Sequence, residues 1–437
     1  MILLRTFKNL FTIPELRQKL MFTLGVIFVY RLGTFIPVIG VDGFLLAQYM
    51  ESAKTLGGLF QFLDTFSGSA LAQCTVFALG IGPYITASIM MQLLSMSIPS
   101  LELLVKEGEH GRKIINQYTR YLACVLSIVY SFGYATFLVA NGLVIDPGIW
   151  FRIVFMTTLT AGSMFVMWLG EQVSLFGLGN GASVIVFAGI VARFPRDILS
   201  TVLWVMEDRI DVVGAVGIWA IFVILTMCII FLERGDRKVP VQYARRVIGN
   251  RMYAGQSTYI PFKLNPVGVM PVLFAQAILN IPLQIAGFLA GRFDFFKSLL
   301  GDYLAYNGLL FNILTFVLII IFYYVYAALL YNPVEIADNL KKNGGFVPGI
   351  RPGKQTADFF DFILTRIGVA GALYLATLAV LPTVIYSVIT MPFFLSGTSI
   401  LIAVGVALDT SAQIEAYLIE RRYEGFLSIG RVKGRVS

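Results

Sequence analysis

Charge is scarce in this sequence, and the scarcity sets the class of protein. Of 437 residues, 13% are charged and 57% are hydrophobic, with a mean hydropathy of +0.80. A water-soluble domain carries about 25% charged residues, so this chain could not cover itself with polar surface. Its apolar residues form blocks of the roughly 20 residues that a helix needs to cross a bilayer. The sequence therefore predicts an all-α integral membrane protein.

Histidine and cysteine are also scarce. The one histidine, His110, lies in a polar stretch, which excludes a metal site built on imidazoles and argues against a Ser-His-Asp arrangement. Cys74, Cys124 and Cys228 lie inside apolar blocks without C-x-x-C spacing, so neither a zinc site nor a disulfide framework is indicated. No P-loop or other nucleotide motif is present. We expect no enzyme activity, no cofactor and no metal.

Ten apolar segments are predicted to span the membrane. They lie near residues 20–39, 70–94, 118–140, 149–169, 178–203, 212–232, 267–290, 308–331, 367–388 and 393–410. The first follows a basic start but has no small-residue cleavage site, so it is not a cleavable signal. The fifth is the weakest, because its apolar run ends at Ala192, before Arg193.

The basic residues decide the topology. With ten spans and both termini cytoplasmic, 25 of the 33 Lys and Arg residues fall in cytoplasmic segments, as the positive-inside rule requires. The exceptions include Arg31, Arg193 and Arg196. Dropping the fifth span would place the most basic segment, 233–266, outside. The net charge of +8 is therefore attributed to topology and not to nucleic-acid binding.

Two of the cytoplasmic segments are too long and too basic to be simple connectors. They cover 233–266 and 332–366, and both mix Arg and Lys with Gly and Pro. They could serve as topology determinants alone. Alternatively, they form a docking surface for a large acidic partner, because clustered Arg residues in a shaped loop can bind phosphate or carboxylate.

The stretch 56–69 is apolar enough to enter a bilayer but too short to cross it. It contains Asp64 and is flanked by glycines that permit sharp turns. A carboxylate at membrane depth is tolerated inside protein or beside water. The alternatives are a surface loop helix and a re-entrant plug in a channel. Ionisable groups in or beside the spans are few and lie mostly near span ends, among them Arg31, Glu171 and Asp409, which argues against an ion-coupled transporter.

Several long segments resemble the SecY family. They match in order and spacing over nearly the whole chain: ALGIGPYITASI (78–89), KEGEHGRKIINQYTRY (106–121), WLGEQ (168–172), GLGNGASVIVFAGIVA (177–192), the segment 233–271, NPVEIADNLKKNGGFVPGIRPGKQT (332–356) and GTSILIAVGVALD (397–409). One departure is Gly82, where the family pattern has a larger residue.

The resemblance implies ten transmembrane helices in two pseudo-symmetric halves of five, with a re-entrant plug helix. The first half would cover 1–203, the second 204–410, and a cytoplasmic tail 411–437. It also implies a channel closed by an aliphatic pore ring. The ring residues would be Ile81, Ile85, Val186, Leu273 and Ile402. The plug residues would be Phe60, Gln61, Phe62, Leu63, Asp64, Thr65, Phe66, Ser67, Gly68 and Ser69.

A lateral gate is implied between spans two and three on one side and spans seven and eight on the other. Its polar residues would be Thr86, Gln92, Gln276 and Asn280. Docking of the motor ATPase SecA or of a ribosome would use Arg245, Arg246, Arg251, Arg351 and Lys354. The other implied partners are the small membrane subunits SecE and SecG, preprotein signal sequences and membrane lipids. The implied location is the bacterial plasma (inner) membrane.

Two other function classes compete with a protein-conducting channel. A secondary transporter or lipid scramblase would need a polar site at the membrane midplane, where the spans offer aliphatic residues and scattered amides. An intramembrane protease would need a Ser-His dyad or two facing aspartates, and Asp409 has no evident partner in the sequence. A solute-flux assay isolates the first of these classes, and a peptide-cleavage assay isolates the second.

Overall fold

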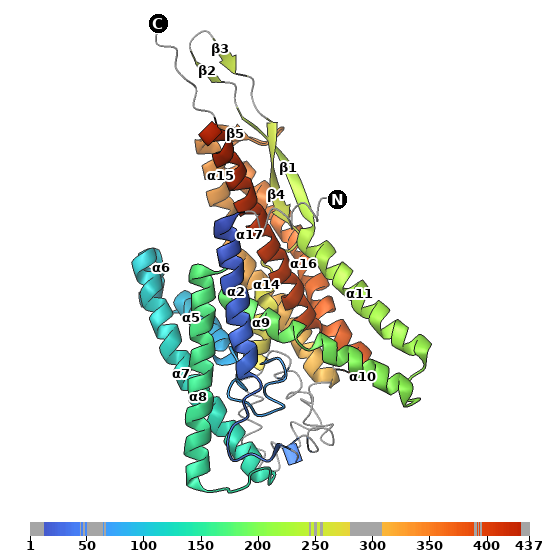
Figure 1. Cartoon of the computed structure of the whole chain (residues 1–437). Coiled ribbons are helices and arrows are strands. Elements are labelled where there is room, and N and C mark those ends of the chain that lie inside the picture. Colours follow the sequence, from blue (N-terminus) through green and yellow to red (C-terminus); the bar gives the residue numbers. More distant parts are fainter. Residues whose placement is uncertain are drawn as a thin grey trace. The chain divides into compact units, whose positions relative to one another are not determined.

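The computed structural model describes residues 13–43, 45, 46, 49, 64, 67–243, 246–248, 251–253, 257–279, 308–388, 391, 393 and 396–429 (Figure 1). Over these residues the protein is mostly helical. The chain divides into two compact units. The first comprises Met1–Ser200, Gln284–Gly301 and Ile402–Ser437, and the second comprises Thr201–Leu283 and Asp302–Leu401.

Small residues bring the helices of the first unit close together. These helices are α2 (Pro14–Gly33), α5 (Gly82–Ser97), α6 (Pro99–Lys106), α7 (Glu109–Ala140), α8 (Ile149–Phe176), α9 (Gly181–Val191), the start of α10 (Phe194–Met206) and most of α17 (Gly397–Ile429). Ser127 Oγ on α7 donates to Ser163 Oγ on α8 at 3.2 Å. At Gly162, an added Cβ would lie 2.1 Å from the carbonyl oxygen of Val76. Such close backbone approach is the usual mode of helix packing in membranes.

The predicted fifth span is not one helix. Helix α9 ends at Val191 and α10 begins at Phe194. Pro195 lies in the first turn of α10, where its missing N–H costs nothing, but its ring prevents continuation of α9. The break places Arg193 between the two helices, at the point where the apolar run ends.

The second unit combines long apolar helices with a small sheet. Its helices are α11 (Val212–Arg234), α14 (Leu309–Leu330), α15 (Pro333–Lys342) and α16 (Lys354–Val388). Its strands are β1 (Asp236–Tyr243), β2 (Arg246–Ile248), β3 (Arg251–Tyr253), β4 (Ser257–Lys263) and β5 (Gly345–Phe346). The sheet order is β4-β1-β5, with both pairings antiparallel, and β2 pairs with β3 in a separate ribbon.

Strands were not expected between residues 233 and 266, where the sequence analysis predicted a loop. Val239 and Val241 are buried and alternate with exposed neighbours along β1, as in a half-buried strand. They pack in one cluster with Phe262 of β4, Leu340 of α15 and Phe360 of α16. The two predicted loops therefore share one hydrophobic core, and the fold is helical with an added sheet. We call the segment from β1 to β4 the β insert.

Six helices of the described residues are long and apolar enough to cross a membrane, and the bent pair α5–α6 raises the number to seven. Five of the six are α7, α8, α11, α16 and α17. The sixth, Leu309–Lys342, joins α14 and α15. Helix α2 corresponds to the first predicted span but ends at Gly33, not at residue 39. Of the seventh predicted span, a short apolar helix, Met270–Leu279, is described. The count of ten stays a prediction.

Candidate functional site

The described end of the predicted plug stretch, 56–69, lies in the first unit and carries a buried charge. Of the ten predicted plug residues, Asp64, Ser67, Gly68 and Ser69 are described. The other six lie outside the described residues: Phe60, Gln61, Phe62, Leu63, Thr65 and Phe66.

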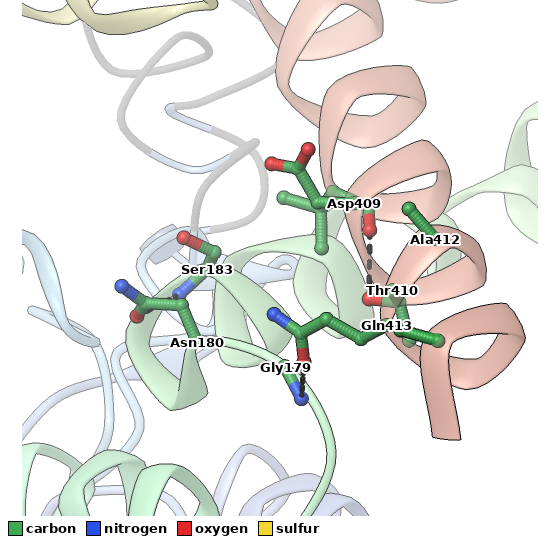
Figure 2. A pocket seen from close by; sticks show the side chains of 9 residues that line it. Gly179, Asn180, Ser183, Asp409, Thr410, Ala412 and Gln413 are labelled. Carbon is green, nitrogen blue, oxygen red and sulfur yellow. Dashed lines mark hydrogen bonds between the residues drawn. The ribbon is translucent and has the colours of Figure 1, made fainter. Parts of the chain in front are cut away.

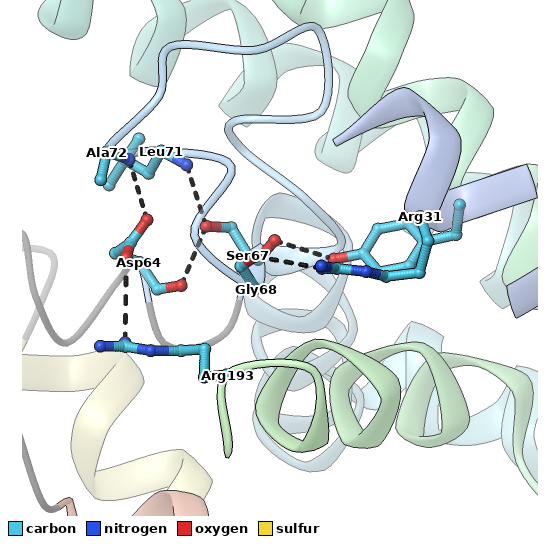
Figure 3. A network of polar contacts seen from close by, with 8 residues as sticks. Arg31, Asp64, Ser67, Gly68, Leu71, Ala72 and Arg193 are labelled. Carbon is cyan, nitrogen blue, oxygen red and sulfur yellow. Dashed lines mark hydrogen bonds and ion pairs between the residues drawn. The ribbon is translucent and has the colours of Figure 1, made fainter. Parts of the chain in front are cut away.

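Asp64 is held by a backbone amide and faces a guanidinium (Figure 3). Its side chain is 10% exposed, and Asp64 Oδ1 accepts a hydrogen bond from Ala72 N at 2.8 Å. Asp64 Oδ2 lies 3.8 Å from Nη1 of Arg193, which is also largely buried. At this distance the carboxylate and the guanidinium attract each other electrostatically but do not form a hydrogen bond. Burial raises the pKa of the Asp64 carboxyl above its ordinary value, and the Arg193 charge opposes that rise.

The residues after Asp64 are tied to helix α2 (Figure 3). Tyr30 Oη donates to the carbonyl oxygen of Ser67, and Arg31 Nη1 donates to that of Gly68, both at 3.1 Å. Gly68 has a φ of +66°, and an added Cβ would lie 3.0 Å from Gly189 Cα. Only glycine meets both conditions without strain. The described end of the predicted plug stretch is thus fastened to α2 through Ser67 and Gly68, and Asp64 pairs with the α9–α10 break.

Sequence reasoning identified Asp64 but missed its partners. A signal for them existed, because Arg31 and Arg193 are among the basic residues that the positive-inside rule leaves unexplained. A guanidinium outside the predicted cytoplasmic segments needs a partner if it lies at membrane depth. Here the partners are a carboxylate for Arg193 and a carbonyl group for Arg31.

The predicted ring residues come from both units. Ile81, Val186 and Ile402 are buried, and Ile85 and Leu273 are half-buried. Leu273 belongs to the second unit, and the other four belong to the first. Since each unit is described by itself, the assembly of these five side chains into one constriction stays a prediction.

The predicted gate residues are polar groups on apolar helices. Thr86 Oγ1 donates to the carbonyl oxygen of Gly82 one turn earlier, at 3.1 Å. Gln92 Oε1 is buried and has no hydrogen-bond partner within the described part of the chain. Gln276 is 8% exposed, and Asn280 lies outside the described residues. Such side chains favour a neighbouring helix or water over lipid.

Of the predicted docking residues, two are described with their side chains. Arg351 and Lys354 are exposed, and the turn around them contains Gly349 and Gly353 at positive φ. The carbonyl oxygen of Arg351 accepts from Thr356 Oγ1 at 2.9 Å, which fixes the turn to the first residues of α16. Arg246 begins β2 and Arg251 begins β3. Arg245 lies outside the described residues.

A cavity of about 350 Å³ lies between the start of α9 and the middle of α17 (Figure 2). Gly179 N, in the loop before α9, donates to Gln413 Oε1 at 3.0 Å and so closes one side. The remaining lining residues are Asn180, Ser183, Val406, Asp409, Thr410, Ala412 and Ala416. Asp409, predicted as an isolated carboxylate near a span end, therefore lies at the wall of this cavity, with its side chain exposed.

These features define a multi-pass helical membrane protein with a polar, fastened element folded among its apolar helices. Its fold matches solved channel structures. One is titled "The structure of a protein conducting channel" (TM-score 0.68, 19% identity, 95% of both chains). Another is Sec61 in the canine ribosome-channel complex from the endoplasmic reticulum (TM-score 0.66, 18% identity, 95% of both chains).

Sequence comparison identifies the family. The SecY family model matches residues 75–411. A protein translocase subunit SecY of Streptomyces scabiei is 43% identical, over 97% of this chain and all of the relative. Those of Aquifex aeolicus and Escherichia coli K12 are each 41% identical, over 96% of this chain and 98% and 96% of the relatives. The chain belongs to the SecY family of protein translocase subunits.

Proposed function

We propose that this chain is the channel through which unfolded preproteins cross a bacterial plasma membrane, and that it releases apolar segments sideways into lipid. The observation that carries the proposal is the re-entrant exit, where buried Asp64 and Arg193 hold a short segment among apolar helices. Such a buried polar anchor suits an element that must stay in place at rest and still be displaceable. Membership of a translocase family supports the same conclusion.

The proposed architecture has ten helices in two halves of five, both termini in the cytoplasm and a gate between spans two and three and spans seven and eight. Branched aliphatic side chains in the ring would narrow the pore and exclude water, so the resting channel would hold back ions. The ring offers no fixed hydrogen-bond partner, so it could surround any extended polypeptide. A signal helix could leave through the gate with a free-energy gain set by its apolar surface.

Partners supply the driving force in this proposal, since the sequence carries no nucleotide motif. A SecA-type motor or a translating ribosome would dock on the basic turn around Arg351 and on the β insert, and SecE and SecG would complete the complex. One solved structure with this fold is named as part of a ribosome-channel complex, which supports a ribosome as partner. Exposed Arg351, on a turn fixed by Thr356, supports recognition of carboxylate or phosphate.

The direct test is reconstitution of the purified chain in liposomes with SecE, SecG, the motor and ATP. A preprotein should become resistant to added protease as it enters the lumen. Flux of small solutes or cleavage of the preprotein, without protection, would instead indicate a transporter or an intramembrane protease.

The ring yields a prediction for the resting channel. We expect Ile402→Asn or Ile81→Asn to raise its ion conductance in planar bilayers, because a polar side chain helps water to wet the constriction. Less hydrophobic signals should also be accepted more readily. Val139→Asn, on α7 and outside the ring, is the comparison for a polar residue in a span. Wild-type conductance in both ring variants would show the ring assignment to be wrong.

Removal of the re-entrant segment gives a second prediction. Deleting Phe60–Ser69 should leave a channel that inserts, assembles and leaks transiently, because a short non-spanning segment adds little to helix packing. Membrane insertion, measured by alkaline extraction, and single-channel recording test the two halves of this expectation. A variant that fails to insert would assign the segment a structural role instead.

A further inference from the structure

The two ends of the β insert meet in a partly buried hydrogen-bonded junction within the second unit. Leu264 N donates to the carbonyl oxygen of Gly235 at 2.8 Å. One residue further on, Asn265 Nδ2 donates to Glu233 Oε1 at 2.7 Å. Glu233 lies in the last turn of α11, so the chain that leaves the helix and the chain that returns are joined side chain to side chain.

The junction is packed against two further helices. Tyr323 Oη on α14 donates to the carbonyl oxygen of Leu264 at 3.3 Å. At Gly371 on α16, an added Cβ would lie 2.5 Å from that same oxygen. Gly235 is equally confined, with Leu264 Cδ1 at 2.2 Å from its Cβ position. A small displacement of the insert at this level therefore meets backbone and ring atoms of α14 and α16.

Asn265 also reaches the helix that follows. Its Nδ2 makes a second hydrogen bond, to the carbonyl oxygen of Gly268 at 3.0 Å, and Gly268 has a φ of +65°. Two residues later begins the short helix Met270–Leu279, which carries the predicted ring residue Leu273 and gate residue Gln276. A single amide thus joins α11, the end of the insert and the entry to this helix.

The chemistry of the position requires a donor. Asn265 is 2% exposed, and its Oδ1 is buried without a hydrogen-bond partner within the described residues. An unpartnered buried oxygen destabilises the fold, so the amide stabilises this junction through its two N–H groups and not through its oxygen. Aspartate has the same shape but supplies no donor when ionised.

We infer that Asn265 is a positioning residue that couples the β insert to the helix Met270–Leu279. The inference rests on the proposed function, in which a motor or ribosome contacts the insert. With the junction intact, movement of the insert is passed to the helix that carries Leu273. If the junction is broken, the insert still binds its partner, but its movement no longer displaces the helix Met270–Leu279.

The test uses three variants of the reconstituted channel with its small subunits. Asn265→Asp faces Glu233 with a second carboxylate, and we expect motor-driven protection of a preprotein to fall about tenfold or more. Motor affinity, measured separately, should stay within about twofold because the docking surface is unchanged. Glu233→Gln keeps an acceptor oxygen for Asn265 and should transport normally. Asn265→Asp with Glu233→Gln restores a hydrogen bond between the two side chains but not the donor to the Gly268 carbonyl, so transport should stay below that of the wild type.

A second measurement covers the case in which Asn265→Asp fails to fold. Asn265→Ala removes both donors and the unpartnered oxygen without adding charge. Hydrogen exchange in Met270–Leu279 should change when the motor binds the wild type and should not respond in this variant. A wild-type response in Asn265→Ala, normal transport by Asn265→Asp, or full wild-type transport by the double variant would each overturn the inference. Absence of transport by the wild type itself would instead refute the proposed function.

Discussion

Replacing Arg351 by glutamate is expected to abolish most motor-driven translocation while leaving the channel folded and inserted. The side chain is exposed, and its backbone lies in a turn held by Thr356 and by two glycines at positive φ. No packing is lost with the guanidinium, so thermal unfolding should shift little. At a docking contact, however, reversing the charge turns attraction into repulsion, which can cost several kcal/mol.

Two comparison variants separate geometry from charge at this site. Arg351→Lys keeps the charge but loses bidentate pairing, so an intermediate loss is expected. Lys342→Glu makes the same charge change at another exposed position on the same basic segment, 332–366, and it should have a small effect. Arg245, Arg246 and Arg251 should act in the same direction as Arg351 but more weakly one by one, with ribosome binding the most salt-sensitive readout.

Motor ATPase stimulation and ribosome co-sedimentation on the purified channel are the decisive measurements. If Arg351→Glu leaves both unchanged and translocation intact, the basic segments set topology alone. An equal loss in Lys342→Glu would point to overall charge and not to a docking geometry.

The sequence predicted most of the long helices because their signal is local. Helices α7, α8, α11 and α14 each contain a long apolar run, which is the strongest signal that a membrane sequence contains, although Arg120 lies in α7 and Arg152 in α8. The end of the apolar run at Ala192 likewise indicated where α9 stops, although not that a second helix begins at Phe194.

The β insert shows where local reasoning fails. Val239 and Val241 alternate as in a strand, but the surrounding Arg, Lys, Gly and Pro residues are equally typical of a loop. The strand is stabilised by contacts with the other basic segment, 332–366. Its valines pack against Leu340 and Phe360 of that segment, and Tyr243 pairs with Gly345. Contacts between segments so far apart leave no trace in either segment alone.

Only part of the candidate site could be predicted from the sequence. A carboxylate in an apolar, glycine-flanked stretch identified Asp64 as a residue that needs a partner. The partner, Arg193, comes from a helix break more than a hundred residues later, and its choice depends on the tertiary fold. Asn265 gave no sequence signal, because asparagine before proline is a common turn dipeptide.

Arg193→Glu is expected to be the most damaging single change in the channel's resting state. It would place a second carboxylate near Asp64, where the side chains are now 14% and 10% exposed and 3.8 Å apart. At an effective dielectric constant of 20, unit charges at that distance interact by about 4 kcal/mol, so attraction would become repulsion of similar size. Breaking a buried pair typically costs about 3–5 kcal/mol.

The consequence should be loss of the closed state before loss of the whole fold. The contacts from Tyr30 and Arg31 to Ser67 and Gly68 are backbone-directed and would remain, so the segment would stay tethered to α2 while its Asp64 end is released. We expect a large rise in resting ion conductance, growth defects on expression, and a lower thermal unfolding temperature for the purified protein.

A matched surface pair gives the control. Arg209 and Glu207 are closer, at 2.7 Å, but their side chains are 61% and 50% exposed. An exposed pair contributes about 0–1 kcal/mol, so Arg209→Glu should leave conductance and thermal unfolding unchanged even though its ion pair is shorter. Burial, and not distance, would then account for the difference between the two sites.

The pairing itself is tested by a second change at Asp64. Asp64→Asn keeps an oxygen that can accept from Ala72 N and removes the charge, so combining it with Arg193→Glu eliminates the repulsion. The double variant should therefore leak less than Arg193→Glu alone. If planar-bilayer recordings show equal conductance for the single and double variants, Arg193 does not act through Asp64. The anchor of the predicted plug would then have to lie in its contacts with α2.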